Sequence, residues 1–293
     1  AGVPRLPVEL ATLPQSWYRF VNLRVVSYAL PALIAIGQCV HFHRSTWNPL
    51  TGTLRRLARG RSLRVLERIQ PSSGGYLEAT PLTSFVVMSL ASMGVGPSDD
   101  SPAGRVVASG VGFLIDSQRD DGSWPIDSNL SVWVTTLTVN ALSAAGDLES
   151  LPDRDRLAAW LLDQQTRERH PFTGANPHAW GWSHLPGSVP DCDDTPGALL
   201  ALANLKPTIE DPTLRGRIDA ALATGLKWVE NLQNADGGWP TFCRGWSGLP
   251  FDRSGSDLTA HALRAMRKLC PETDFDRRKS VRRAEAYLRG QQR

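Results

Sequence analysis

Three aspartates fall within four positions of this 293-residue chain, at Asp191, Asp193 and Asp194. They follow a proline and precede an apolar run at helical spacing. Carboxylates there favour the positive end of a helix dipole and cap its free backbone amides, although capping needs only one of the three. Carboxylates crowded together in a buried setting cannot all ionise cheaply. We therefore expect the group to hold one proton and to serve as a general acid.

A second pair of ionisable groups lies further along the chain, in Asp257-Leu-Thr-Ala-His261. Residues four apart share one face of a helix, so an ordinary surface pair is one interpretation. The other is that His261 assists the aspartate cluster. An imidazolium would then stabilise the flanking carboxylates and make the proton held by the cluster more acidic.

Helical periodicity dominates the chain around these groups, and strand signals are almost absent. The chain contains 10 Trp, which indicates either many planar packing anchors or a cavity lined by aromatic faces. We predict an all-α chain with helices near Val25–Gln38, Leu54–Ile69, Leu82–Met93, Ala103–Ser117, Ser131–Ala145, Asp155–Gln165, Pro196–Asn204, Leu214–Gln233, Asp257–Lys268 and Ser280–Gln291.

An internal repeat connects these helices. Its pattern is Gly, an aromatic and an apolar residue, then Gln, Gly and Trp at fixed spacing. It occurs at Gly110–Trp124 and Gly225–Trp239, with weaker copies at Gln70–Tyr76, at Trp160–Gln165, which lacks the Gly and the Trp, and at Ala284–Gln292. The Gln amide can bond loop backbone, Gly allows a tight turn, and Trp packs over the junction. We therefore predict a structural role for the repeat.

The motif Asp191-Cys192-Asp193-Asp194-Thr195 resembles the Asp-x-Asp-Asp-Thr motif of class II terpene cyclases, most closely the squalene-hopene cyclases. The repeat resembles their QW motif, and Asp257–His261 resembles their Asp-Val-Thr-Ala-His segment. This resemblance implies an α/α-barrel (toroid) fold of the terpene cyclase and prenyltransferase type. In that family the middle aspartate protonates a terminal alkene. Asp193 is thus the expected acid, assisted by Asp191, Asp194 and His261.

The resemblance also points to residues that would contact substrate. Trp180 and Trp182 stand where the family has Phe-Ala-Phe, and Phe242 stands at a cavity-facing aromatic position. Aromatic faces stabilise a carbocation without offering a nucleophilic lone pair, whereas core packing is the alternative. Leu249-Pro250-Phe251 resembles the gate of the substrate channel, and Asp257 completes the predicted set. A Trp in place of Phe would shrink the cavity, and the loop after Phe251 is shorter than in the family.

Compared with the family, the chain covers parts of two barrel domains. We expect residues 1–150 to belong to the first and 151–293 to the second, with the boundary near Glu149–Asp153. Ala1 is not an initiator Met, and Arg293 ends the chain inside a repeat, which suggests truncation or the edge of an ordered region.

Membrane contact is expected from two segments of the first part. Val25–Gly37 is too short to span a bilayer, so it is either a buried helix or a helix that dips into one leaflet. Arg55–Arg64 is either a solvated helix face or a contact for anionic headgroups. The resemblance implies a monotopic, peripheral membrane protein on the cytoplasmic side.

Composition excludes several classes of function. A net charge of +3, without a basic block interleaved with aromatics, argues against nucleic-acid binding. Four cysteines without paired spacing, and no secretory leader, fit a reducing compartment. Cys39, His41 and His43 find no fourth ligand elsewhere, so neither a metal nor a cofactor is expected.

The favoured hypothesis is a triterpene cyclase that protonates squalene or a related polyprene. One alternative is a class II cyclase of a prenyl diphosphate, which would need a basic site that the sequence does not reveal. Another is a non-catalytic, lipid-binding α/α-barrel fragment. A protein prenyltransferase would need zinc ligands that cannot be assembled here. The oligomeric state is open, with a homodimer as one option.

Overall fold

The structure is a computed structural model that describes residues 7–14, 17, 28–44, 48–171, 173–242, 252–276 and 278–292. Over these residues it is helical, with two isolated β-bridges and no β-strand. The all-α prediction is thus confirmed. Phe251, expected at a channel gate, lies outside the described residues, as does the beginning of the segment predicted as a helix from Val25.

The chain divides into two compact units, each described here by itself. The first comprises Ala1–Asn129 and Leu185–Ser188, and the second comprises Leu130–His184 and Val189–Arg293.

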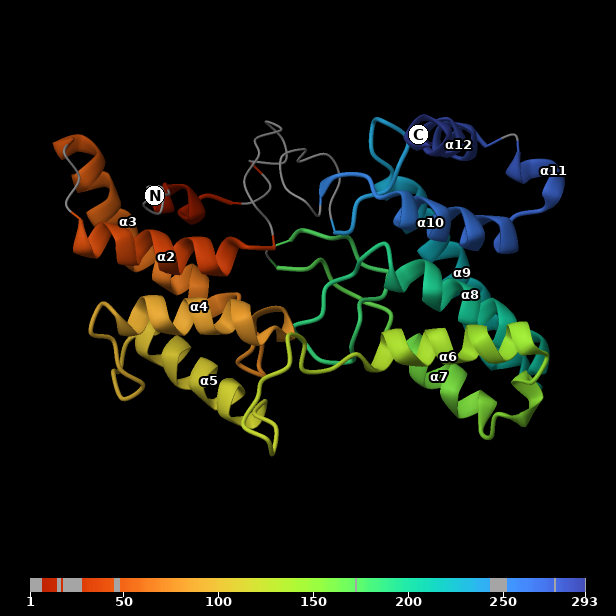
Figure 1. The fold of residues 1–293 in the computed structure, drawn as a ribbon, viewed down its shortest axis with the longest axis horizontal. Coiled ribbons are helices and arrows are strands. Elements are labelled where there is room, and N and C mark those ends of the chain that lie inside the picture. The colour runs from red at the N-terminus through yellow and green to blue at the C-terminus, as the bar shows by residue number, and fades with distance from the viewer. Residues whose placement is uncertain are drawn as a thin grey trace. The chain divides into compact units, whose positions relative to one another are not determined.

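The first unit is built from paired helices (Figure 1). Its elements are η1 (Val8–Thr12), α2 (Leu30–His43), α3 (Pro49–Arg68), η2 (Tyr76–Glu78), α4 (Thr80–Ala91) and α5 (Pro102–Asp116). Helix α4 packs against α2 and α5, and α3 packs against η1, α2 and α5. Sequence signals for helix starts explain several of these boundaries. The side chain of Asn48 accepts hydrogen bonds at the beginning of α3, and that of Ser101 does so at the beginning of α5.

The second unit surrounds one central helix. Its elements are α6 (Ser131–Ala145), η3 (Leu148–Ser150), α7 (Arg154–Asp163), α8 (Asp194–Leu205), η4 (Lys206–Thr208), α9 (Pro212–Leu232), α10 (Ser256–Leu269), α11 (Glu272–Phe275) and α12 (Lys279–Gln291). Helix α8 packs against α6, α7, α9 and α10 (Figure 1). Small residues such as Gly197, Ala198 and Ala201 are buried along it and allow these neighbours to approach closely. The residues that immediately precede α8 are the aspartate motif.

The boundary between the units differs from the expected one. It falls between Asn129 and Leu130, earlier in the chain than Glu149–Asp153. The reason is α6, which was expected in the first domain. Its buried residues Val132 and Val139 belong to the same hydrophobic core as α8, so α6 belongs to the second unit.

The two segments considered for membrane contact differ in how far they are buried. In α2, Ile34 and Ala35 are fully buried, which favours the buried-helix interpretation. Helix α3 carries the arginine run. Arg55 is buried and paired with Glu9 at 3.2 Å, whereas the remaining arginines of the run are exposed. In the described part of the chain, no helix is both long and apolar enough to cross a membrane.

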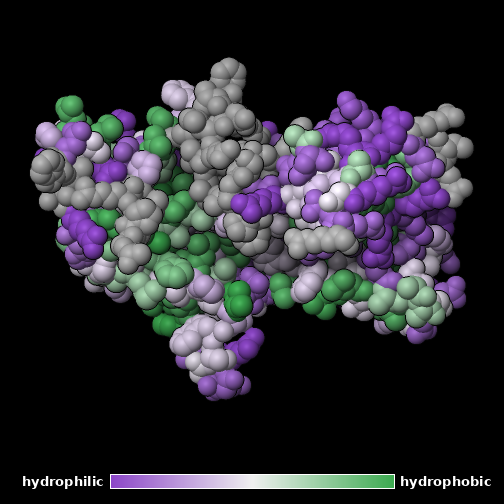
Figure 2. Space-filling view, turned by 45° about the horizontal axis from the view of Figure 1, so that its top comes forward, coloured by the Kyte–Doolittle hydropathy of each residue, from purple (hydrophilic) through white to green (hydrophobic). Residues whose placement is uncertain are grey.

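Polar and apolar surface are unevenly distributed. Hydrophilic residues cover most of the face over the C-terminal helices, at the right of Figure 2, whereas apolar residues reach the surface more often at the left. Helix α12 accounts for part of the polar face, because only Val281 and Ala284 of its residues are buried.

Candidate active site

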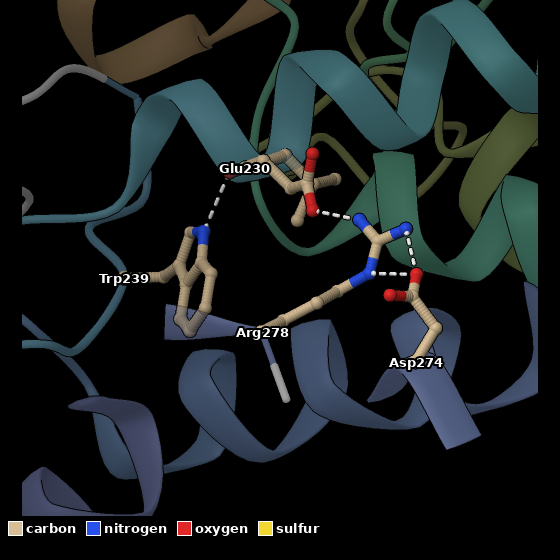
Figure 3. A network of polar contacts seen from close by, with 5 residues as sticks. Glu230, Trp239, Asp274 and Arg278 are labelled. Atoms are coloured by element: carbon tan, nitrogen blue, oxygen red, sulfur yellow. Dashed lines mark hydrogen bonds and ion pairs between the residues drawn. The ribbon is translucent and has the colours of Figure 1, made fainter. Parts of the chain in front are cut away.

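The repeat forms its full set of contacts at Gln233 in the second unit. The Gln233 amide Nε2 donates to the carbonyls of Gly237 and Ser280, both at 2.8 Å. The Trp239 indole donates to the carbonyl of Val229 at 2.7 Å (Figure 3), and the Trp239 backbone N–H donates to Thr259 Oγ1 at 3.1 Å. The repeat thereby ties the end of α9 to the beginnings of α10 and α12.

Two repeats of the first unit make related contacts. Gln70 Nε2 donates to the Gly74 carbonyl at 2.9 Å, and the Tyr76 hydroxyl donates to the Leu66 carbonyl at 2.9 Å. In the other copy, the Trp124 indole donates to the Leu114 carbonyl at 2.7 Å. Tyr therefore replaces Trp in the weaker copy with the same kind of backbone acceptor.

The copy that ends at Gln165 also forms the Gln and Trp contacts, although it was predicted to lack the Gly and the Trp. Gln165 Nε2 donates to the His178 carbonyl at 3.1 Å, and the Trp180 indole donates to the Leu161 carbonyl at 2.7 Å. His178 has a φ of 75°, in the left-handed region occupied by glycine in the other copies. His178-x-Trp180 therefore replaces Gly-x-Trp. The short His-Ala-Trp match was the available signal, but the longer loop before it concealed the copy.

Trp180 belongs to this repeat. Its side chain has no exposed surface, and its backbone N–H donates to Thr195 Oγ1 at 3.0 Å. A side chain without accessible surface does not support the expected direct contact with a substrate. We therefore treat Trp180 as a residue that positions the aspartate motif, of which Thr195 is the last member.

Asp191 fixes the beginning of α8. Its Oδ1 accepts hydrogen bonds from the backbone N–H groups of Asp193 at 2.8 Å and Asp194 at 2.7 Å. Its own N–H donates to the Trp180 carbonyl at 3.1 Å, and its side chain is buried. The capping interpretation of the aspartates thus applies to Asp191.

The cluster holds a buried proton, as its crowding predicted, and this proton lies on Asp194. Burial raises the pKa of Asp194, and the adjacent charge of Asp191 and the hydrogen bond between the two carboxyl groups raise it further. Burial also raises the pKa of Asp191, while the two backbone donors oppose that rise. Asp194 is therefore the protonated member of this pair. Its other oxygen, Oδ1, is buried and has no hydrogen-bond partner among the described residues.

Asp193 has an exposed side chain, in contrast to its two neighbours. His261 of α10 is hydrogen-bonded to the Asp193 backbone carbonyl. A Cβ added at Gly197, one turn along α8, would lie 3.6 Å from His261 Nε2, so the two helices are in close contact here. The structure therefore brings His261 to the acid motif, as the sequence predicted.

The surroundings of His261 disfavour the positive charge that was expected on its ring. Burial lowers the pKa of His261, Arg264 lowers it further, and the negative charge of Asp193 only partly opposes this. His261 is thus a neutral imidazole at neutral pH. It orients the beginning of α8 through a hydrogen bond, and it does not supply the predicted imidazolium charge.

Two of the predicted aromatic residues meet. The rings of Trp182 and Phe242 are 6.1 Å apart at an interplanar angle of 62°, an edge-to-face arrangement. The Trp182 carbonyl accepts the N–H groups of Val132 and Trp133, which fixes it to the beginning of α6. The Cys192 N–H donates to the Thr241 carbonyl at 2.9 Å and so ties the acid motif to the residue before Phe242.

Asp257 is exposed at the beginning of α10. Burial raises the pKa of the Cys192 thiol, and the charges of Asp191, Asp193 and Asp257 add to this rise, which places Asp257 near the motif. Among the described residues, no three His, Cys, Asp or Glu side chains are placed to hold a metal ion.

These features define a helical repeat protein of the α/α-barrel class, with a carboxyl cluster at the beginning of its central helix. Residues 129–293, more than half of the chain, match the family of the squalene-hopene cyclase C-terminal domain. The chain belongs to the squalene-hopene cyclase family.

Individual relatives agree with this assignment. The chain is 33% identical over 196 residues to a squalene-hopene cyclase of Alicyclobacillus acidocaldarius, covering 60% of this chain and 29% of that protein. It is 30% identical over 182 residues to sporulenol synthase of Bacillus subtilis, covering 61% and 26%. With dammaradiene synthase of Dryopteris crassirhizoma it shares 28% over 251 residues, covering 78% and 35%. The chain thus spans about a third or less of these relatives.

Proposed function

We propose that this chain carries the protonating site of a class II terpene cyclase that acts on squalene or a related polyprene. Asp193 is the expected acid, because it stands at the middle position of the motif, and its side chain is exposed whereas those of Asp191 and Asp194 are buried. The observation that carries the proposal is the arrangement around it. A buried carboxyl pair and a neutral His261 hold the beginning of α8. The Trp182–Phe242 pair is tied to the motif by the hydrogen bond from the Cys192 N–H to the carbonyl of Thr241, the residue before Phe242.

The proposed reaction is an isomerisation, in which the proton added at the start is balanced by a proton lost at the end. The carboxyl proton adds to the terminal double bond, whose π electrons form the new C–H bond and leave a tertiary cation. Ring closure moves the cation along the chain, and loss of a proton from a neighbouring carbon to a base ends the isomerisation. Aromatic faces stabilise such cations without trapping them. Solvent can reload Asp193, because its side chain is exposed.

The test compares two aspartate variants of the complete protein incubated with squalene in detergent. We expect Asp193→Asn to lower cyclisation by about 100-fold or more, in the range for loss of a general acid. Asp163→Asn changes an exposed carboxylate on α7 and is the matched control. Undiminished product from Asp193→Asn would rule out the proposed acid. No product from the unmodified protein would favour the non-catalytic, lipid-binding alternative.

We also propose monotopic membrane association, on the cytoplasmic side, through α3 in place of α2. Leu50, Leu54 and Leu57 are 80%, 53% and 74% exposed on α3, and the exposed arginines of this helix suit anionic headgroups. Leu54→Gln combined with Leu57→Gln should reduce sedimentation with phosphatidylglycerol vesicles. The control Ile126→Gln, at a position 73% exposed, should not. Equal sedimentation of both variants would contradict this surface.

A further inference from the structure

The loop in front of the acid motif is shared between the two units. Residues 181–190 belong to the second unit except for the tip of the loop, Leu185–Ser188, which belongs to the first. The loop is closed at its base, where the Asp191 N–H donates to the Trp180 carbonyl at 3.1 Å. A group of the first unit that holds the tip therefore acts on a segment that leads directly into the motif.

The loop is stiff between its tip and the motif. The tip is a turn in which the Ser188 N–H donates to the Leu185 carbonyl at 3.1 Å. Pro186 occupies the second position of this turn, where its fixed φ suits the turn geometry. Pro190 fixes φ again directly before the motif, and Val189 is fully buried. Because few soft dihedral angles separate the tip from the motif, a displacement of the tip should be carried to it.

Glu78 of the first unit holds this tip. It has no exposed surface, and its Oε1 accepts hydrogen bonds from the Gly187 N–H at 2.7 Å and from the Ser73 hydroxyl at 3.0 Å. A Cβ added at Gly187 would overlap the same oxygen. Glycine therefore allows the backbone of the loop to approach the carboxyl group this closely.

The backbone at Glu78 is strained where it makes this contact. Leu77 and Glu78 have φ values of 56° and 53°, in the left-handed region that residues with a side chain rarely occupy. The neighbouring chain holds them there, because the Ser128 N–H donates to the Glu78 carbonyl and the Thr80 N–H donates to the Ile126 carbonyl, both at 3.0 Å. Strain that is maintained in this way is typical of residues whose placement serves a function.

We propose that Glu78 is a positioning residue of the acid site, which holds Gly187 and thereby fixes the segment that enters the aspartate motif. Glu78 acts through the loop and not on the substrate itself. Its effect on catalysis rests on the proposed function, whereas its effect on the order of the motif does not. The sequence alone does not reveal this role, because Glu78 and Gly187 lie 109 positions apart.

Hydrogen exchange of the complete protein tests the order of the motif without any substrate. Glu78→Ala removes the acceptor of the Gly187 N–H, whereas Glu78→Gln keeps a carbonyl oxygen there. The matched control Tyr76→Phe removes another buried hydrogen bond of η2, to the Leu66 carbonyl, and leaves the loop untouched. We expect the amides of residues 189–195 to exchange about tenfold faster in Glu78→Ala, and at the unmodified rate in Glu78→Gln and Tyr76→Phe.

A second variant reaches the same contact from the other side. Gly187→Ala pushes the Glu78 carboxyl group aside and should loosen residues 189–195 to a similar extent, so the test stands even if Glu78→Ala does not fold. Thermal melts establish which variants are folded.

Activity with squalene then separates positioning from a general loss of stability. At a temperature where the variants are folded, Glu78→Ala and Gly187→Ala should each lower kcat about tenfold and change KM by less than about twofold. The double variant should lose no more than either alone, because both substitutions break one contact. Glu78→Gln should restore kcat, and Tyr76→Phe should keep it.

The outcomes distinguish this proposal from the proposed function. Unchanged exchange at residues 189–195 in Glu78→Ala and Gly187→Ala would overturn the positioning role, as would equally fast exchange in Tyr76→Phe. Faster exchange without a loss of kcat in an active protein would overturn its importance for catalysis. If the unmodified protein forms no product while Glu78→Ala still loosens the motif, the proposed function fails and the positioning role stands.

Discussion

The repeats at Gln233 and Gln165 reach the same contacts by different routes. In each, the Gln amide donates to the carbonyl of a residue with positive φ, and an indole two residues later donates back to the preceding helix. The carbonyl is four residues after Gln233 but thirteen after Gln165. The junction therefore tolerates a longer loop, provided that the residue with positive φ and the Trp return to the same positions.

The comparison also shows how the repeats serve the site. Trp239 donates its backbone N–H to Thr259 of α10, and Trp180 donates its N–H to Thr195 of α8. Thr259 stands two residues before His261, and Thr195 directly follows Asp194. The two repeats thus fix the beginnings of α8 and α10, the helices that carry the candidate acid group and its histidine.

The sharpest difference between the repeats is their residue with positive φ. A Cβ at Gly237, where φ is 98°, would lie 2.3 Å from the Arg283 carbonyl oxygen, so Gly237→Ala combines backbone strain with a clash. We expect it to lower the free energy of unfolding by about 3 kcal/mol or more. His178→Gly relieves strain and removes only an exposed side chain, so it should change stability by about 1 kcal/mol or less. Urea unfolding measures both. A loss of stability in His178→Gly as large as that in Gly237→Ala would contradict the prediction, because it would show that the repeat at Gln165 needs the His178 side chain and not only a residue with positive φ.

A smaller effect is expected from the paired threonines. Thr195→Val and Thr259→Val keep the shape of each buried side chain but leave a Trp N–H without its acceptor, which costs about 1–3 kcal/mol. Both variants should lose stability to a similar extent.

Activity should separate the two threonine variants. Thr195 adjoins the acid cluster, so Thr195→Val should lower kcat about tenfold, equivalent to about 1.4 kcal/mol, with KM nearly unchanged. Thr259→Val displaces only the helix that carries His261 and should lower kcat less. The rates are compared at a temperature where both variants are fully folded. A larger loss of kcat in Thr259→Val would indicate that His261 has a more direct part than orientation.

Local patterns predicted much of this structure. The periodicity of apolar residues gave each long helix of the described chain, and α6 was predicted with its observed bounds, Ser131–Ala145. The aspartate motif and His261 were predicted to meet, and they do. These successes depend on signals that lie within one helix or one motif.

The misses all depend on contacts between distant segments. Trp180 was assigned to a substrate cavity, because its role becomes visible only when Leu161 and Thr195 are seen beside it. The buried proton on Asp194 was not predicted as such, because burial decides which carboxyl keeps a proton at neutral pH, and burial is a property of the packed α8. The neutral state of His261 follows from burial in the same way.

The pH dependence of stability can test where the proton lies. Folded Asp194 keeps its proton above the pH at which the unfolded chain releases it, so the unfolded state binds fewer protons over that interval. The free energy of unfolding should then fall as pH rises from about 4 toward the raised pKa of Asp194, by at most about 1.4 kcal/mol per pH unit.

Asp194→Asn supplies a neutral donor to Asp191 at every pH and should flatten this slope, whereas the exposed control Asp163→Asn should keep it. The comparison is made by urea unfolding between pH 5.5 and 8.5. An unchanged slope in Asp194→Asn would place the proton elsewhere in the cluster, and Asp193→Asn would then be the next variant to titrate.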